Sequence, residues 1–247
     1  NLIHTAVVTL FAASAAHAQQ AVQWKVSDGG NGHWYRISTS TAYWEQMRTI
    51  AVANGGHLAT ITSAGENNFV FGLLPSSSPY AFFIGGSRNS SGVWSWVTGE
   101  PWSYTNWDVG EPNGIGQQIT WIHGPAAPRP ATWNDHPASD YAFYGVIEYE
   151  SDCNNDNIVD YGQILNGTLP DTNANNIPDC CEEGIPCSPC YAFDLNPTGI
   201  VDGADLGALL AFWGPVSPAF PRADINRDGD VNGADLGLLL ANWGPCP

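Results

Sequence analysis

The chain is poor in basic residues and has no cysteine in its first 150 residues. Its 247 residues include 7 Lys and Arg against 24 Asp and Glu, which gives a formal net charge of −17. Such an acidic chain is repelled by nucleic acid and by anionic membrane surfaces, so neither is an expected partner. The composition instead favours cations, or neutral ligands that are bound through a cation.

The charge and the cysteines are distributed unevenly along the chain. Residues 1–150 hold 10 acidic and 5 basic residues, whereas residues 151–247 hold 14 acidic and 2 basic residues. All 6 cysteines lie in the second segment. We therefore expect at least two kinds of module, and only the second kind can contain disulfides.

An apolar run over residues 6–16 leads into Ala16-His17-Ala18, which matches the small-x-small pattern of a signal-peptide cleavage site. We predict a signal peptide over residues 1–18, truncated at its start, and hence a secreted, extracellular protein. Export would permit disulfides. A buried helix is the alternative interpretation. No later apolar run reaches the roughly 20 residues of a membrane-spanning helix, so no membrane span is expected.

Residues 19–150 have the pattern of an α+β domain. Apolar residues recur at spacings of three and four over residues 41–54, which predicts a helix. Ser63 and Glu66 have the spacing of a capping box, so a second helix is expected over residues 63–74. Strands are predicted over residues 34–38, 57–61, 81–86 and 144–150.

The region between the last two predicted strands is rich in Gly, Pro and Asn, and loops of such length are usually functional. It contains Glu111 and Asn113 in an E-P-N motif, and Asn134 and Asp135 in a W-N-D motif. Their carboxylate and amide oxygens are ligands of the kind that Ca²⁺ takes, in sets of roughly six to eight. We predict that these four residues form a calcium site.

Pro112 can direct the side chains of Glu111 and Asn113 to the same side, most readily through a cis peptide bond. Four protein ligands leave open positions on the ion, which two adjacent sugar hydroxyls could fill. Glu111 would then accept a hydrogen bond from a hydroxyl and Asn113 would donate one. The tryptophans of this region could also form a sugar-stacking platform, although most of them are expected to be core.

The order of these strands, helices and motifs resembles the C-type lectin-like domain over about residues 33–150. The resemblance implies an α+β fold with two helices, two small antiparallel sheets and a long calcium-binding loop region. It also implies carbohydrate binding through Ca²⁺ at Glu111, Asn113, Asn134 and Asp135. In this family E-P-N is typical of binding to mannose- and glucose-type sugars, and the galactose-type motif Q-P-D is absent here.

The segment departs from the family pattern in two respects. The family usually has two disulfides, but this stretch has no cysteine, so a tryptophan-rich core must stabilise it. Gln117 and Gln118 stand where the family usually has another acid, which predicts weak calcium binding with a Kd on the order of 10⁻⁴–10⁻³ M. The alternative is a lectin-like domain that binds a protein surface and no sugar.

Residues 151–190 form an acidic linker that is rich in Cys and Asn. Residues 152–160 and 171–179 both follow D-x-N-x-(D/N)-N-I-x-D, which resembles the calcium-binding turns of thrombospondin type 3 or EF-like loops. A flexible acidic linker is the alternative. Four cysteines follow at Cys180, Cys181, Cys187 and Cys190, where an exported protein favours disulfides over a zinc site.

The C-terminal segment, residues 191–247, contains an internal duplication. Residues 194–215 and 224–245 align with 15 of 22 positions identical, and each copy begins with a loop whose acidic and amide residues have EF-type spacing. The expected ligands of the first loop are Asp194, Asn196, Thr198, the Ile200 carbonyl, Asp202 and Asp205. Those of the second loop are Asp224, Asn226, Asp228, Asp230 through its carbonyl, Asn232 and Asp235.

The first of these sites should be the weaker one, because Thr198 replaces an acid. Each loop leads into a short helix that ends before Trp-Gly-Pro, since proline cannot continue a helix. The arrangement resembles a type I dockerin, which implies a small all-α, EF-hand-like module and a cohesin domain as partner. Cohesin-binding residues usually lie at loop positions 10 and 11 in that family, and these are the small pairs Gly203-Ala204 and Gly233-Ala234 here. A structural or cell-surface anchoring role is therefore the alternative to cohesin binding. We also predict a Cys190–Cys246 disulfide that joins the ends of the module.

Taken together, these patterns predict a secreted, calcium-binding lectin with an assembly module and no enzymatic activity. No Ser–His–Asp or Cys–His set lies in a catalytic sequence context. The rival hypothesis is a non-enzymatic interaction or cell-surface scaffold protein.

Overall fold

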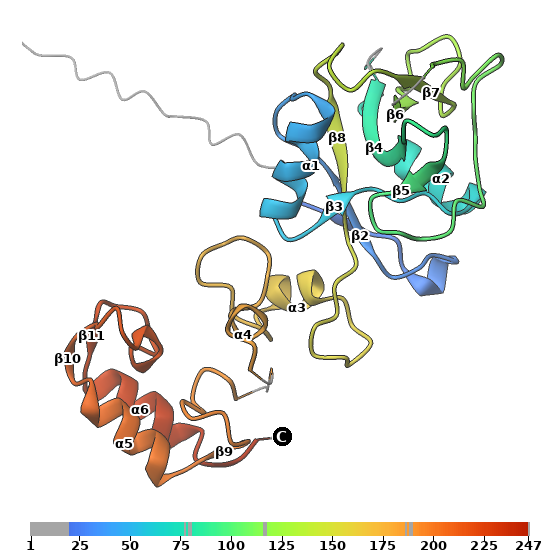
Figure 1. Cartoon of the computed structure of the whole chain (residues 1–247). Helices are drawn as coiled ribbons and strands as arrows, with labels where there is room; N and C mark the ends of the chain where they lie inside the picture. Colours follow the sequence, from blue (N-terminus) through green and yellow to red (C-terminus); the bar gives the residue numbers. More distant parts are fainter. Residues whose placement is uncertain are drawn as a thin grey trace, which may run out of the picture.

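The chain contains an N-terminal domain, a linker and a C-terminal module (Figure 1). The structure is a computed structural model that describes residues 20–76, 78, 81–115, 118–185, 187 and 190–246. The predicted signal peptide, residues 1–18, lies outside the described residues. Within the described ranges, the helices are all too short or too polar to cross a membrane.

The strands of the N-terminal domain form one eight-stranded sheet with two antiparallel groups. The first group consists of β1 (Val22–Gln23), β2 (Trp34–Ile37), β3 (His57–Leu58) and β8 (Tyr144–Tyr149). The second consists of β4 (Ala81–Arg88), β5 (Trp94–Trp96), β6 (Gln118–His123) and β7 (Trp133–His136). A short parallel pairing of β4 with β8 joins the groups. The two small antiparallel sheets expected from the sequence are therefore continuous with each other.

Both predicted helices are present, as α1 (Trp44–Ala53) and α2 (Ala64–Leu73), and a 3-10 turn, η1 (Val26–Asp28), precedes them. The Ser63 hydroxyl accepts a hydrogen bond from the Glu66 backbone N–H at 3.1 Å, which confirms the predicted N-cap. The Glu66 carboxylate accepts from the backbone N–H of Thr62, at 2.7 Å, so the reciprocal half of a capping box is replaced by a bond to the preceding residue.

A cluster of aromatic rings stabilises this cysteine-free domain. Trp133 is fully buried, and its ring centroid lies 5.7 Å from that of Trp96 and 5.8 Å from that of Trp107. The Trp133 Nε1–H donates to Asn67 Oδ1 at 2.7 Å, so its one polar atom is satisfied. Aromatic side chains bury large areas, and edge-to-face pairs add to that stabilisation. The prediction that most tryptophans of the long loop region are core is confirmed for Trp96, Trp121 and Trp133, whereas Trp94, Trp102 and Trp107 are half-buried.

A second set of partly or fully buried side chains, centred on Glu148 and Glu150, connects the ends of β2, β3 and β8. Glu148 on β8 is 1% exposed, and it contacts the Tyr35 hydroxyl at 2.8 Å and His33 Nδ1 at 2.7 Å. The ring of His57 lies beside Glu150, with Nε2 and Oε1 separated by 3.2 Å. Burial alone would lower the pKa of His57, but the contacts with Glu150 and Glu148 raise it to about 9.

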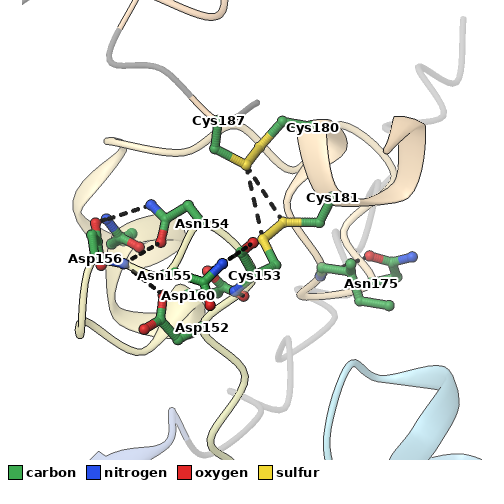
Figure 2. The surroundings of a disulfide bond; sticks show 12 residues. Asp152, Cys153, Asn154, Asn155, Asp156, Asp160, Asn175, Cys180, Cys181 and Cys187 are labelled. Carbon is green, nitrogen blue, oxygen red and sulfur yellow. Dashed lines mark hydrogen bonds between the residues drawn. A yellow bond between two sulfur atoms is a disulfide. The ribbon is translucent and has the colours of Figure 1, made fainter. Parts of the chain in front are cut away.

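The linker is folded and disulfide-bonded. It contains two short helices, α3 (Asp160–Asn166) and α4 (Asp179–Glu183). Disulfides join Cys153 to Cys181 and Cys180 to Cys187 (Figure 2). The zinc alternative is wrong, because the thiolates that it requires are oxidised. The expectation that disulfides form in this segment is confirmed.

The C-terminal module contains two loop–helix units, with helices α5 (Gly203–Ala211) and α6 (Gly233–Ala241). Strand β9 (Ile200–Val201) pairs with β12 (Gly244–Pro245), and β10 (Gly214–Pro215) pairs with β11 (Asp230–Val231). A 3-10 turn, η2 (Pro221–Ala223), joins the units. Each loop thus pairs with the segment that follows the other unit's helix.

Two sequence expectations for this module meet different outcomes. The expectation that the module is all-α is wrong, because backbone pairing between the duplicated halves forms two pairs of short strands. The predicted Cys190–Cys246 disulfide is confirmed, with the two Cα atoms 5.6 Å apart.

Candidate functional site

The E-P-N segment lies in the loop between β5 and β6, and W-N-D forms the start of β7. Two backbone hydrogen bonds attach this loop to β7: the Asp108 N–H donates to the Trp133 carbonyl, and the Trp133 N–H donates to the Asn106 carbonyl, each at 2.8 Å. Strand alternation then buries Trp133 and Asp135 and leaves Asn134 half-buried. The buried Trp133 therefore fixes the strand that presents the next two side chains to the loop.

All four predicted site residues of this domain come together. The Glu111 carboxylate accepts hydrogen bonds from the side-chain amides of Asn113 at 3.0 Å and of Asn134 at 3.1 Å. Asp135 Oδ1 accepts from the Asn113 backbone N–H at 3.0 Å. The Glu111–Pro112 peptide bond is cis, as predicted from the sequence. Residues separated by more than twenty positions thus form one compact cluster of side chains.

The cluster concentrates negative charge. Asp135 is 3% exposed, and its second oxygen accepts from the Gly114 backbone N–H at 3.1 Å. Burial, followed by the carboxylates of Asp135 and Asp108, raises the pKa of Glu111 above its ordinary value. A bound cation would reverse this effect, because it favours the ionised form of both carboxylates.

The residues present fit a calcium ion. Glu111 and Asp135 offer carboxylate oxygens and Asn113 and Asn134 offer amide oxygens, which is the hard-oxygen chemistry of calcium ligands. Neither Gln117 nor the side chain of Gln118 lies within the described part of the chain, so their contribution stays a prediction.

Sequence reasoning missed an ion pair that borders the cluster. Arg129 Nη1 lies 2.8 Å from Asp108 Oδ1 and closes the segment between β6 and β7 onto the E-P-N loop. Nothing in the sequence indicates this contact, because the partners are 21 positions apart in regions without regular structure. Two exposed apolar side chains, Val109 and Ile115, also flank the motif and were not singled out.

The two histidines near the motifs have structural partners. His123 Nδ1 lies 3.1 Å from the Thr132 hydroxyl, and the His136 ring stacks on Trp121 with its Nδ1 3.0 Å from Asp140. These contacts support a structural role for both side chains.

The predicted ligands of the first C-terminal loop also converge. Asp194 accepts from the Thr198 backbone N–H at 3.0 Å, and Asp205 is fully buried and accepts from the backbone N–H groups of Asn196 and Asp202. Asn196 Oδ1 faces only oxygens: Thr198 Oγ1 at 3.1 Å, Asp205 Oδ1 at 3.0 Å and Asp194 Oδ1 at 3.1 Å. With its amide rotated, Asn196 would donate to these same oxygens, so the side chain lies among the predicted ligands of the loop.

The second C-terminal loop repeats the arrangement. Asp224 accepts from the backbone N–H groups of Asp228 at 3.1 Å and Gly229 at 2.9 Å. Asp235 is fully buried and accepts from the Asn226 and Asn232 N–H groups. The predicted ligands Asp202 and Asn232 cap their helices, because their side-chain oxygens accept from the Ala204 and Ala234 backbone N–H groups. Asp230 lies in β11, where only its carbonyl was expected to act.

Comparison with known proteins finds relatives of the N-terminal part of the chain. The Lectin C-type domain family model matches residues 39–144. Human C-type lectin domain family 17, member A is 34% identical over 107 residues, which is 42% of this chain and 26% of that protein. Human C-type lectin domain family 4 member E is 37% identical over 106 residues, which is 41% of this chain and 47% of that protein.

A solved structure was also found, the cow C-type carbohydrate-recognition domain of CD23 in the presence of a GlcNAc2Man3 oligosaccharide. It is 22% identical, has a TM-score of 0.45, and covers 55% of this chain and 96% of that one. The chain spans less than half the length of the curated relatives. Residues 39–144 of this chain therefore match the C-type lectin domain, and the similarity to the curated relatives covers 41–42% of the chain.

Proposed function

We propose that the N-terminal domain binds carbohydrate through a calcium ion held by Glu111, Asn113, Asn134 and Asp135. The observation that carries the proposal is the convergence of the two asparagine side chains on the Glu111 carboxylate, with Asp135 joined to the same cluster through the Asn113 backbone N–H. Asp135 and the two asparagines would complete the protein share of the ligand shell. The protein is a binding module in this proposal and has no enzymatic role.

Sugar recognition would follow from the same side chains. Glu111 would accept a hydrogen bond from one hydroxyl, and the Asn113 amide would donate one to its neighbour. The half-exposed position of this cluster leaves its outer side open to a ligand. Val109, which is 83% exposed, would offer apolar contact to a sugar ring beside the hydroxyls. The E-P-N motif favours mannose- or glucose-type sugars.

Elution from a mannose resin tests this function. The full chain should bind the resin in calcium and leave it when EDTA is added. Glu111→Ala should abolish retention, whereas Glu45→Gln on exposed α1 should not change it. Retention that persists in EDTA, or that survives Glu111→Ala, would overturn the proposal.

The C-terminal module is proposed to bind calcium in its two loops and to dock onto a protein partner, such as a cohesin domain or a cell-surface component. Exposed apolar side chains support docking, because they recur symmetrically in the two units. Leu210 and Trp213 are each 50% exposed, and Leu240 and Trp243 are 50% and 49% exposed. Aromatic residues of this kind are enriched at protein interfaces. The localisation that fits both modules is extracellular.

The rival function is a scaffold protein whose lectin domain binds no sugar. The same exposed pairs on the C-terminal module favour it, since assembly requires no glycan. A glycan array without signal, combined with capture of a purified cohesin domain, would favour this rival. Glycan signal that depends on calcium would exclude it.

A further inference from the structure

We propose that residues 152–163 of the linker bind a calcium ion of their own, and that this ion fixes the linker against the lectin domain. The inference does not depend on sugar binding. An EF-type loop takes ligands from positions 1, 3, 5, 7, 9 and 12, the seventh through its backbone carbonyl. Numbered from Asp152, these positions are Asp152, Asn154, Asp156, Ile158, Asp160 and Gln163.

The backbone of this loop follows that of the second C-terminal loop. Asp152 accepts from the N–H groups of Asp156 at 3.1 Å and Asn157 at 2.9 Å. Asp224 accepts from the N–H groups at the same offsets, again at 3.1 and 2.9 Å. Asn157 has a φ of +66°, in the place where Gly229 has +96°. The linker loop therefore turns in the way that lets side-chain oxygens converge.

Gln163 is the observation that points to a ligand. The residue is 5% exposed, and its Oε1 atom is buried without a hydrogen-bond partner among the described residues. Its Nε2–H donates to Asp156 Oδ2 at 2.6 Å, so the amide lies at the loop. Buried amide oxygens are rarely left unpaired. A cation inside the loop would give Gln163 Oε1 the partner that it lacks.

The loop also contains three carboxylates. Asp160 is 2% exposed and accepts a hydrogen bond from the Cys153 N–H at 3.0 Å. Figure 2 shows Asp152, Asp156 and Asp160 in one loop beside the Cys153–Cys181 disulfide. In the part of the chain that the structure describes, no ion pair involves Asp152, Asp156 or Asp160. A buried carboxylate is unfavourable unless it is paired or binds a metal.

The second linker loop, residues 171–182, has the same spacing but different contacts. Its position-12 residue, Glu182, already accepts from the amides of Asn173 at 3.0 Å and Asn175 at 2.8 Å. Arg227 Nη2 lies 3.6 Å from Asp179, its position-9 residue. These groups partly neutralise the loop without a cation. The proposal is therefore restricted to residues 152–163.

Binding here would act on the contact between the linker and the lectin domain. Tyr161 directly follows the proposed ligand Asp160, and its ring stacks on Tyr149 of β8 with the centroids 4.2 Å apart. The same ring lies 5.6 Å from Trp34 of β2. An ion that holds Asp160 would hold the first turn of α3, and with it this aromatic contact.

Hydrogen exchange of the full chain, measured by mass spectrometry across a calcium titration, tests the proposal. Peptides that cover residues 152–163 should exchange more slowly as calcium is added. Asp156→Asn should raise the calcium concentration for half-maximal protection of these peptides about tenfold or more. The C-terminal loops should respond as in the unmodified chain. Glu45→Gln, which removes a carboxylate from exposed α1, serves as the matched control.

The variant Gln163→Glu distinguishes whether Gln163 is a calcium ligand or only a structural side chain. It introduces the carboxylate that EF-type loops have at position 12, so the half-maximal calcium concentration should fall about tenfold. If Gln163 only donates to Asp156, the new charge would repel Asp156 and the calcium concentration would not fall. The proposal is overturned if calcium leaves exchange in these peptides unchanged, or if Gln163→Glu fails to lower the required concentration.

Discussion

Glu111 accepts hydrogen bonds from Asn113 and Asn134, so one carboxylate organises side chains from a loop and a strand. In the proposed function, the pattern of donors and acceptors in this cluster decides which sugar hydroxyls bind. Replacing the Glu111 carboxylate by an amide and the Asn113 amide by a carboxylate should therefore change the sugar preference, because both new side chains still offer an oxygen ligand.

The double variant Glu111→Gln, Asn113→Asp converts E-P-N into the galactose-type Q-P-D motif. We expect preference to shift from mannose toward galactose by about tenfold or more, because the hydrogen-bond polarity at the two positions is exchanged. Competition assays with the two free sugars measure this ratio. Glu100→Gln, in the same long loop region, is the control and should leave it unchanged. An unaltered ratio of mannose to galactose binding in the double variant would mean that the E-P-N motif does not determine sugar preference.

His57 predicts a pH dependence of stability. Its pKa in the folded chain is about 9, compared with 6.5 for the unperturbed side chain. The stabilisation is fully present below pH 6.5 and is lost as the pH rises through 9, because deprotonation removes the interaction with Glu150. The hydrogen bond from His57 is the main cause that lowers the pKa of Glu150. The Glu150 carboxylate therefore stabilises the fold above its ordinary pKa, and this stabilisation is lost as the pH falls through its lowered pKa.

The difference in pKa corresponds to at most about 3 kcal/mol of unfolding free energy. Urea unfolding of the full chain at pH 6, 7.5 and 9 measures it, and the free energy should fall across this range. His57→Gln should flatten the profile, leaving the smaller slope that His33 contributes through its own raised pKa. A flat profile in the unmodified chain would contradict the role of this pair.

At the scale of elements, the helices and the buried strands follow from local pattern. The N-cap at Ser63 and the apolar spacing of α1 are local properties, so the sequence predicts them within a few residues. The parallel pairing of β4 with β8 and the Arg129–Asp108 pair join distant segments, and no local pattern encodes such contacts. Gln163 was missed for a related reason, because the predicted linker motif ended at Asp160 before the helix that returns Gln163 to the loop.

The Cys190–Cys246 disulfide closes the C-terminal module, and its removal should destabilise that module alone. A cross-link over a loop of this length restricts the unfolded chain by about 2–4 kcal/mol. The double variant Cys190→Ser, Cys246→Ser should therefore unfold the module at lower urea, with the lectin domain unchanged. Tryptophan fluorescence combined with hydrogen exchange distinguishes the two parts. Unchanged exchange in residues 191–246 would contradict this assignment.

At the scale of the whole molecule, the lectin-type cluster, the linker loop and the duplicated C-terminal loops all place clustered oxygens in an acidic chain. Their spacing in the sequence predicted the residues of the first and last sites, and these residues do converge. The sequence could not show that the linker packs on the lectin domain, where the Asn176 amide donates to the Asn54 carbonyl at 3.1 Å. That contact depends on the tertiary position of two turns.

The central claim is that Glu111 and its neighbours hold calcium for sugar binding, and calorimetric titration of the full chain tests it most directly. Calcium is titrated into the unmodified chain and into Glu111→Ala, each with and without mannose. The account predicts that mannose tightens one calcium-binding event in the unmodified chain, and that Glu111→Ala loses that event while the C-terminal loops still bind calcium. Mannose that leaves every calcium-binding event unchanged, or an unaltered titration of Glu111→Ala, would contradict it.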